Sequence, residues 1–260
     1  MVNSSGSPVR SIDRVLDVIE ALSNQPHGVT LTNLSSKVGL HISTTHRLLS
    51  SLTARGYAQQ DKETGKYRLT MRLFEIGSRI IGGMNLVSIS RPYLERLAEL
   101  TNEAIHLVAR DGDEVVYLYK EDMRESIVSM ASFVGMRAPM YSTAVGKSIL
   151  ARMSENEVKD IWNRIVVIPF TKNTITHYDA LLRELQITRE RGWAVDNEEN
   201  EPGVLCVGAS IIDFSGTPIG AISVSGPVIH MSEEKRKLCT REVVESARAI
   251  SGLLGFQDNT

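Results

Sequence analysis

The hydrophobic positions of residues 41–56 recur every three or four residues, which predicts a single amphipathic helix. The inward face carries Thr45, Leu48, Leu49 and Leu52. The outward face carries short hydroxyl side chains and Arg47, and no acidic residue occurs from His41 to Ala54. Gly56 is placed to end the helix as a C-terminal cap. Such a face suits a DNA major groove, because phosphates repel carboxylates and arginine reaches guanine edges.

The neighbouring segments extend this helix into a winged helix-turn-helix. Residues 30–38 have the spacing of a short helix, and Gly39 permits a sharp turn before the next one. Residues 57–69 read as two short strands around the polar loop 61–65, which predicts a β-hairpin. The alternative is a small helical core with a neutral surface, which leaves the hairpin and the polar helix face unexplained.

Two more helices are expected beside this module. The first covers Val9–Asn24, and its expected buried side chains are Ile12, Val15, Leu16, Ile19 and Leu22. The second covers Thr70–Ile81, with an apolar stripe formed by Leu69, Leu73, Ile76 and Ile80. This stripe either packs on its own domain or pairs with its twin in a dimer. Gly82 and Gly83 then form a natural hinge.

The pattern changes in the second half of the chain, where short strands alternate with helices. We expect helices at Leu86–Leu100 (bent or restarted at Pro92), Thr143–Arg152, Ser154–Trp162, Tyr178–Arg191 and Ser232–Leu254. We expect strands at Ala104–Ala109, Glu114–Lys120, Ser126–Phe133, Trp193–Asp196, Val204–Asp213 and Pro218–Ser225. Strands joined by hairpins, with helices between them, predict an α+β domain with a mostly antiparallel sheet. The expected division is 1–70, a linker at 71–85, and 86–260.

Composition and charge narrow the function classes. The 260 residues are 42% hydrophobic, yet no apolar run approaches a membrane span and the N-terminus has no apolar signal region. The two cysteines lack metal-ligand spacing, which suits a reducing cytoplasm. The net charge is −2, but residues 1–70 hold 8 basic and 5 acidic residues against 21 and 26 in the remainder. A weakly basic module of this kind needs dimerisation to bind DNA tightly.

Three polar stretches of the second half are candidates for a ligand site. Small residues in Tyr141–Lys147 open a helix, whose free backbone N–H groups suit a carboxylate or phosphate. An acidic loop within Trp193–Cys206 ends in a glycine and a cysteine. In Ala221–Pro227, alternation places Ser223 and Ser225 on one face of a strand. Those two serines either point to solvent or line a polar cavity.

Together, Val38–Leu49, Gly146–Lys147, Gly192–Glu199 and Gly203–Cys206 resemble the IclR family of bacterial transcriptional regulators over nearly the whole chain. The resemblance implies a winged helix-turn-helix, a linker helix and a GAF-like effector domain. It also implies homodimers, often paired into tetramers, on palindromic operator DNA. Further motifs resemble the 2-keto-3-deoxygluconate repressor branch, which senses sugar-acid catabolites. They are Ala104–Leu107, Pro139–Ala144 and Asp196–Glu199.

Position by position, the resemblance implies an effector pocket. It would include Ala144, Val145, Asp196, Cys206, Ser223 and Ser225. The expected DNA contacts are Ser43, Thr44, Thr45, His46 and Arg47 on the helix, with Lys62 and Lys66 on the wing. One departure stands beside the pocket: the family usually has Ala-Ala-Pro or Ala-Val-Pro after the cysteine, whereas this chain has Gly208-Ala209-Ser210. No cofactor and no metal are expected.

The sequence thus predicts a cytoplasmic, sequence-specific repressor controlled by a small carboxylate, with a sugar acid as the first candidate and an aromatic or short keto acid as the alternative. A rival from another class is a hydrolase that uses Cys206, His106 and Asp196 as nucleophile, base and orienting group. Burial of a mid-strand cysteine argues against it, because burial suppresses the thiolate. A metal sensor is disfavoured because the 6 histidines are scattered. A purely architectural DNA binder leaves the large second half without a role.

Overall fold

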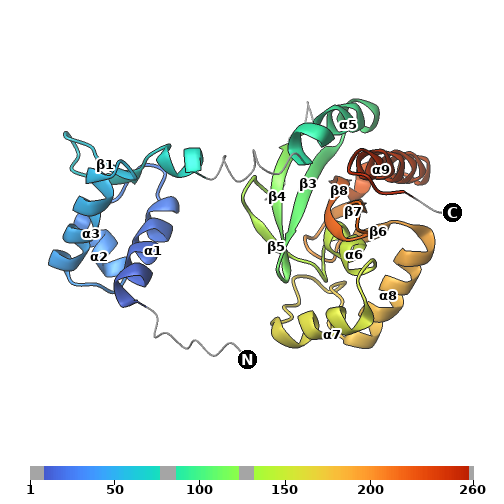
Figure 1. Ribbon diagram of the computed structural model, residues 1–260, viewed down its shortest axis with the longest axis horizontal. Coiled ribbons are helices and arrows are strands. Elements are labelled where there is room, and N and C mark those ends of the chain that lie inside the picture. The colour runs from blue at the N-terminus through green and yellow to red at the C-terminus, as the bar shows by residue number, and fades with distance from the viewer. Residues whose placement is uncertain (1–8, 77–85, 123–131, 258–260) are drawn as a thin grey trace. The chain divides into compact units, whose positions relative to one another are not determined.

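The computed structural model describes residues 9–76, 86–122 and 132–257 (Figure 1). The chain divides into two compact units, Met1–Gly83 and Met84–Thr260, and each is described by itself. Within the described ranges, no helix is both long and apolar enough to cross a membrane.

The N-terminal unit is a winged helix-turn-helix, as predicted. Its elements are α1 (Arg10–Ser23), α2 (Leu31–Lys37), α3 (Ile42–Ala54), β1 (Ala58–Gln60) and β2 (Tyr67–Leu69). The two strands are antiparallel, and Gln59 stands opposite Arg68. Residues 72–76 are helical. The remainder of the helix predicted to Ile81, and the Gly82–Gly83 hinge, lie outside the described residues.

Local signals fix the ends of the two central helices. The Thr30 side chain accepts a hydrogen bond from the backbone N–H of Asn33 at the start of α2. Gly39, in the turn before α3, has φ +64°, which a residue with a Cβ adopts only with strain. Gly56 has φ +76° just after α3, as expected of a C-terminal cap.

The buried face of α1 differs from the prediction. Val18 and Leu22 are buried in the core of this unit, with Val15 and Ile19 packed against it. Ile12 is 57% exposed and Leu16 is 50% exposed, so the expectation that both are buried is wrong. The reason is that only the C-terminal half of α1 contributes to the core, whereas the apolar stripe continues along the whole helix.

The C-terminal unit is an α+β domain with a fully antiparallel six-stranded sheet, in the order β5-β4-β3-β8-β7-β6, which confirms the predicted class. The strands are β3 (Ala104–Asp111), β4 (Glu114–Glu121), β5 (Arg137–Pro139), β6 (Ala194–Asn197), β7 (Val204–Ile212) and β8 (Pro218–Pro227). The helices are α5 (Leu86–Thr101), α6 (Ala144–Leu150), α7 (Glu155–Arg164), α8 (Tyr178–Arg191), a 3₁₀ turn (Val228–His230) and α9 (Glu233–Leu253).

Helices cover both faces of this sheet. α5 and α9 pack on one face, over a core that includes Ile105, Leu107 and Val224. α6 lies on the other face with α7 and α8 around it (Figure 1), over a core that includes Val145 and Ile149. The alternation along β8 therefore directs Ile222 and Val224 towards α9, and Ala221, Ser223 and Ser225 towards α6.

A β-bulge in β4 sorts two tyrosines to opposite faces. Leu107 pairs with Tyr119, while the next residue of β3, Val108, pairs with Tyr117, so β4 holds one extra residue at this point. Tyr119 packs with the α5–α9 core, and Tyr117 packs with the α6 core. Residues two apart in a regular strand lie on the same face, so Tyr117 and Tyr119 would face the same core without the bulge.

Most predicted elements of the C-terminal unit are present with small shifts at their ends. The strand β5 was not predicted, and α5 runs as one helix through Pro92. The expected strand Ser126–Phe133 lies outside the described residues except for its last two positions, which are not in a strand.

Candidate functional site

The outward face of α3 presents polar side chains, as expected of a DNA-reading helix. Ser43, His46 and Arg47 are exposed and Thr44 is partly exposed. The helix begins after His41, whose Nδ1 accepts the backbone N–H of Ser43 at 3.3 Å. The side chains of Ser43 and Arg47 therefore stand on the first turns of α3, the part that reads bases in helix-turn-helix proteins.

Thr45 does not belong to that face. Its side chain is 0% exposed, and its Oγ1 donates to the carbonyl oxygen of His41 at 3.3 Å. The expectation that Thr45 contacts DNA is wrong, because the helical period places it on the core side with Leu49 and Leu52.

The wing presents two lysines from a loop that Asp61 organises. The Asp61 Oδ1 atom accepts the backbone N–H groups of Glu63 at 3.0 Å and Thr64 at 2.8 Å. The backbone and side-chain hydrogen bonds from Thr64 lower the pKa of Asp61 most, and the backbone bond from Glu63 lowers it further. Lys62 and Lys66 are exposed on either side of the turn, where phosphate contacts are available to them.

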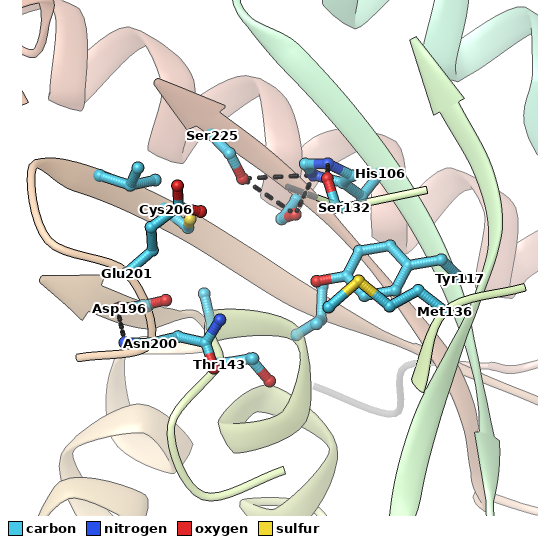
Figure 2. A pocket seen from close by; sticks show the side chains of 14 residues that line it. His106, Tyr117, Ser132, Met136, Thr143, Asp196, Asn200, Glu201, Cys206 and Ser225 are labelled. Atoms are coloured by element: carbon cyan, nitrogen blue, oxygen red, sulfur yellow. Dashed lines mark hydrogen bonds between the residues drawn. The ribbon is translucent and has the colours of Figure 1, made fainter. Parts of the chain in front are cut away.

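The C-terminal unit holds a cavity of about 60 Å³ between the sheet and α6 (Figure 2). Its wall is formed by His106, Tyr117, Ser132, Met136, Thr143, Ala144, Val145, Asp196, Asn200, Glu201, Val204, Cys206, Ser223 and Ser225. All six residues that the sequence nominated for an effector are among them. Of the remaining wall residues, Thr143, Asn200, Glu201 and Val204 lie within the polar stretches that the sequence analysis singled out, whereas His106, Tyr117, Ser132 and Met136 were not expected to contact a ligand.

Two rows of cross-strand neighbours form the sheet side of this cavity. Asp196 of β6 stands opposite Cys206 of β7, which stands opposite Ser225 of β8. In the second row, Ser223 of β8 stands between Gly208 of β7 and His106 of β3. Residues directly opposite in an antiparallel sheet have their side chains adjacent, so chain segments far apart in sequence meet here.

Gly208 allows α6 to lie directly on β7. A Cβ atom at this position would come within 2.9 Å of the backbone C of Ala144 and N of Val145, closer than real contacts allow. The N-cap of α6, Thr143, accepts the backbone N–H of Gly146 at 3.1 Å. The absence of a Cβ at position 208 thus allows the first turn of α6 to form part of the cavity wall.

His106 is the main wall residue that sequence reasoning did not assign to a ligand. Its Nε2 lies 2.9 Å from the Ser132 Oγ, and its Nδ1 lies 3.3 Å from the Ser225 Oγ and 3.4 Å from the Ser223 Oγ. Burial, followed by the charge of Lys120, lowers the pKa of His106 to about 4. The ring is therefore neutral at pH 7, with one nitrogen donating and the other accepting. The pairing of β3 with β8, which brings it here, is not visible in the sequence.

Asp196 is a buried carboxyl group at the cavity edge. It is 4% exposed, and its Oδ1 accepts the backbone N–H groups of Glu199 at 2.7 Å and Asn200 at 3.3 Å. Burial raises the pKa of Asp196 to about 7, although these backbone bonds oppose the shift. A carboxyl group with such a pKa can donate or accept a hydrogen bond near neutral pH.

The contacts of Cys206 do not suit a nucleophile. Burial, followed by the nearby carboxyl of Asp196, raises the pKa of the Cys206 thiol well above its usual value. Among the residues that the structure describes, the His106 ring forms hydrogen bonds with three serines and none with the Cys206 sulfur. In the part of the chain that the structure describes, no cluster of three or more His, Cys, Asp or Glu residues could hold a metal ion.

A buried ion pair lies beneath the cavity loop. Lys147 of α6 contacts Glu199, in the loop after β6, through Nζ and Oε1, and the two side chains are 1% and 10% exposed. Burial raises the pKa of Glu199, and the charge of Lys147 opposes that shift. The second carboxylate oxygen of Glu199 is buried, and no hydrogen-bond partner for it is found among the described residues. The pair ties α6 to the loop that carries Asn200 and Glu201.

Comparisons with known proteins agree with this arrangement. Residues 11–62 match the IclR helix-turn-helix domain, and residues 78–252 match the bacterial transcriptional regulator IclR C-terminal domain. The chain is 36% identical to the transcriptional regulator KdgR of Escherichia coli, over 96% of this chain and 94% of that one. It is 35% identical to the transcriptional repressor YiaJ of the same species, over 95% and 88%.

A solved structure gives the same result for the fold. The crystal structure of the Thermotoga maritima IclR is 34% identical, covers 95% of this chain and 99% of its own, and superposes with a TM-score of 0.83. The cavity, the reading helix and these relationships lead to one conclusion. The chain belongs to the IclR family of bacterial transcriptional regulators and is a DNA-binding transcriptional regulator.

Proposed function

We propose that this regulator is a cytoplasmic repressor that a small carboxylate controls. In this proposal, residues 1–70 bind operator DNA, 71–85 form the linker, and 86–260 bind the effector. The observation that carries the proposal is the polar cavity of the C-terminal unit, where six residues nominated from the sequence alone line one space. Two of the relatives are named as a regulator and a repressor, which supports the direction of control.

On the DNA side, Arg47 is the residue most suited to read a base. It is exposed on α3, and arginine donates two parallel hydrogen bonds to guanine. Ser43, Thr44 and His46 complete the groove-facing surface, while the wing lysines neutralise phosphates. Replacement of Arg47 by alanine is expected to cost about 1–3 kcal/mol of operator binding.

We infer that the protein acts as a homodimer, and two such dimers can pair into a tetramer. The N-terminal unit supports self-association because it exposes large apolar side chains: Met71 is 68% exposed, Phe74 is 63% exposed and Ile12 is 57% exposed. A dimer doubles the phosphate contacts of a weakly basic module and matches a palindromic operator. Sedimentation velocity at micromolar concentration tests this, and a monomer would contradict it.

On the effector side, the cavity supplies hydroxyl groups for a carboxylate and polar partners for further hydroxyls. Ser223 and Ser225 are 3% and 1% exposed and can donate to carboxylate oxygens, together with the backbone at Ala144 and Val145. Asp196 can accept a hydrogen bond from an effector hydroxyl when it is ionised and donate one to a carboxylate oxygen when it is protonated. The resemblance to the 2-keto-3-deoxygluconate repressors and the similarity to KdgR favour a sugar acid.

The size of the cavity favours a second candidate, a short keto acid. At about 60 Å³ it is small beside typical ligand pockets of about 300–1,000 Å³. A three-carbon acid needs little change, whereas a six-carbon acid requires the wall to move. A ligand that fits only a rearranged wall also provides the differential affinity that control of DNA binding demands.

A thermal-shift screen separates these candidates. The probes are 2-keto-3-deoxygluconate, gluconate, pyruvate, glyoxylate and 4-hydroxybenzoate, and saturating binding to the folded state raises the melting temperature. The shift should disappear in the double variant Ser223→Ala with Ser225→Ala. The affinity of the protein for an operator selected from random DNA is then measured with and without the effector. We expect a 5- to 150-fold change, which corresponds to a coupling free energy of about 1–3 kcal/mol. No shift with any carboxylate would contradict the proposed effector class.

A further inference from the structure

The charge of the cavity wall is opposite to what an anionic ligand requires. The wall contains two carboxyl groups, Asp196 and Glu201, and no Lys or Arg occurs among its described residues. His106 does not compensate, because its lowered pKa of about 4 keeps it neutral. The two nearby cations are already paired: Lys147 with Glu199, and Lys120, beside His106 and Ser132, with Asp122. A carboxylate that enters with both wall carboxyls ionised therefore meets repulsion in a poorly hydrated space.

We infer that the cavity binds its carboxylate effector together with one proton, which Asp196 holds, so that a neutral carboxyl group donates a hydrogen bond to the anion. This inference rests on the proposed function, since it assumes a carboxylate effector. The buffer acid gives up the proton, and the O–H bond of the Asp196 carboxyl is the one bond that forms; no bond between heavier atoms changes. A protonated carboxyl is an O–H donor, and bonds from such a donor to a charged oxygen are short and strong.

The geometry selects Asp196 over Glu201 for this role. Glu201 is partly exposed on the loop after β6, whereas Asp196 is only 4% exposed. Both backbone N–H bonds to Asp196 end on Oδ1, so Oδ2 is the oxygen left for a ligand. Figure 2 shows Asp196 at the cavity edge beside Asn200 and Glu201.

The surroundings of Asp196 support a proton held near neutral pH. The titratable groups that face it or share its cavity are Glu199 and Glu201 of the loop, Cys206 of β7, Tyr117 of β4, His106 of β3 and, from α6, Lys147. Lys147 is the one cation in this set, and Glu199 neutralises it. With a pKa of about 7, Asp196 is half protonated before a ligand arrives, and a bound anion raises its proton affinity further.

The inference predicts that effector affinity falls as the pH rises. The effector carboxylate is ionised throughout, so the protonated fraction of Asp196 sets the trend. For a pKa of about 7, the protonated fraction of Asp196 is about 30-fold smaller at pH 8.5 than at pH 6, so binding should be about 30-fold weaker at the higher pH. Isothermal titration of the full chain with 2-keto-3-deoxygluconate, or with pyruvate if it gives the larger thermal shift, measures this directly.

Proton uptake provides a second, independent readout. Titrations at pH 8 in HEPES and in Tris, which have different ionisation enthalpies, should show uptake of about 0.9 proton per effector bound. Asp196→Asn keeps an Oδ1 acceptor and supplies a permanent donor, so it should bind without uptake and with little pH dependence. Glu201→Gln is the matched control: loss of one repelling wall carboxylate should tighten effector binding, while proton uptake and the fall of affinity with rising pH should both remain.

The other outcomes contradict the coupled proton, its assignment to Asp196, or the effector class. Tight binding without uptake, at an affinity constant from pH 6 to 8.5, overturns the inference and leaves the proposed function intact. Uptake that survives Asp196→Asn and disappears in Glu201→Gln overturns the assignment to Asp196. If no carboxylate binds at any pH, the proposed effector class and the inference fail together.

Discussion

Replacement of Lys147 by methionine is expected to destabilise the C-terminal unit strongly. The Lys147 side chain is 1% exposed and contacts Glu199, whose side chain is 10% exposed and whose second oxygen has no partner among the described residues. Methionine fills a similar volume but leaves the Glu199 carboxylate buried without its cation. Breaking a buried pair from one side costs about 3–5 kcal/mol. For a unit of this size, that lowers the melting temperature by about 6–20 °C.

The matched variants isolate the interaction. Glu199→Leu alone leaves a buried ammonium group and is expected to cost as much. Lys147→Met with Glu199→Leu removes both charges and should restore stability to within about 1 kcal/mol of the unmodified protein, because apolar replacement of a whole buried pair is often neutral. The difference between the double variant and the sum of the single ones is the coupling energy.

Tryptophan fluorescence during urea unfolding is the appropriate assay. Trp162 and Trp193 are the 2 tryptophans of the chain, and both lie in Met84–Thr260, so their emission reports on that unit alone. A loss below about 1 kcal/mol in the single Lys147 variant would refute the reasoning. So would a double variant whose loss equals the sum of the single losses, because the two charges would then act independently.

Three further predictions test other parts of the structure. Arg47→Ala should weaken operator binding, measured by fluorescence anisotropy, without changing the melting temperature. Thr45→Asn should lower the melting temperature, because it enlarges a buried polar side chain. A stability loss in Arg47→Ala with no loss of DNA binding would contradict the exposed position and DNA contact of Arg47. Gly208→Ala should alter the effector-induced thermal shift, because its Cβ would lie 2.9 Å from the backbone of Ala144 and Val145 and the first turn of α6 would have to move; an unchanged shift would contradict that contact. His106 has a folded-state pKa of about 4 against about 6.5 unfolded, so the unfolded chain binds more protons between these values and stability falls as the pH drops from 6.5 to 4. Urea unfolding should show that the free energy of unfolding of the unmodified protein falls by about 3 kcal/mol from pH 6.5 to pH 4, and His106→Gln should remove that fall. An identical pH profile in the variant would argue against the buried neutral ring.

Local patterns predicted the elements whose contacts are local. The recognition helix follows from apolar spacing and from Gly56, and the shared face of Ser223 and Ser225 follows from strand alternation. The same period should have excluded Thr45 from the DNA-facing set, because it belongs to the apolar side of α3. The apolar spacing already places Thr45 on the inward face with Leu49 and Leu52, which is incompatible with a DNA contact from the same side chain.

Features set by long-range pairing could not be predicted. His106 reaches the cavity because β3 pairs with β8, which lies more than a hundred residues later in the chain. Tyr117 faces the cavity because a bulge reverses the alternation of β4, and no residue type marks that bulge. Likewise, Ile12 has the spacing of a core residue, yet the core of its unit ends before reaching it.

The cross-strand rows that line the cavity have a consequence for how such regulators diversify. Asp196, Cys206 and Ser225 hold their places through backbone hydrogen bonds between strands, and those bonds do not depend on side-chain identity. A single codon change at one of these positions therefore alters the chemistry offered to a ligand and leaves the register of the sheet intact. New inducer preferences can accumulate stepwise on one scaffold, while the DNA-reading module is inherited unchanged.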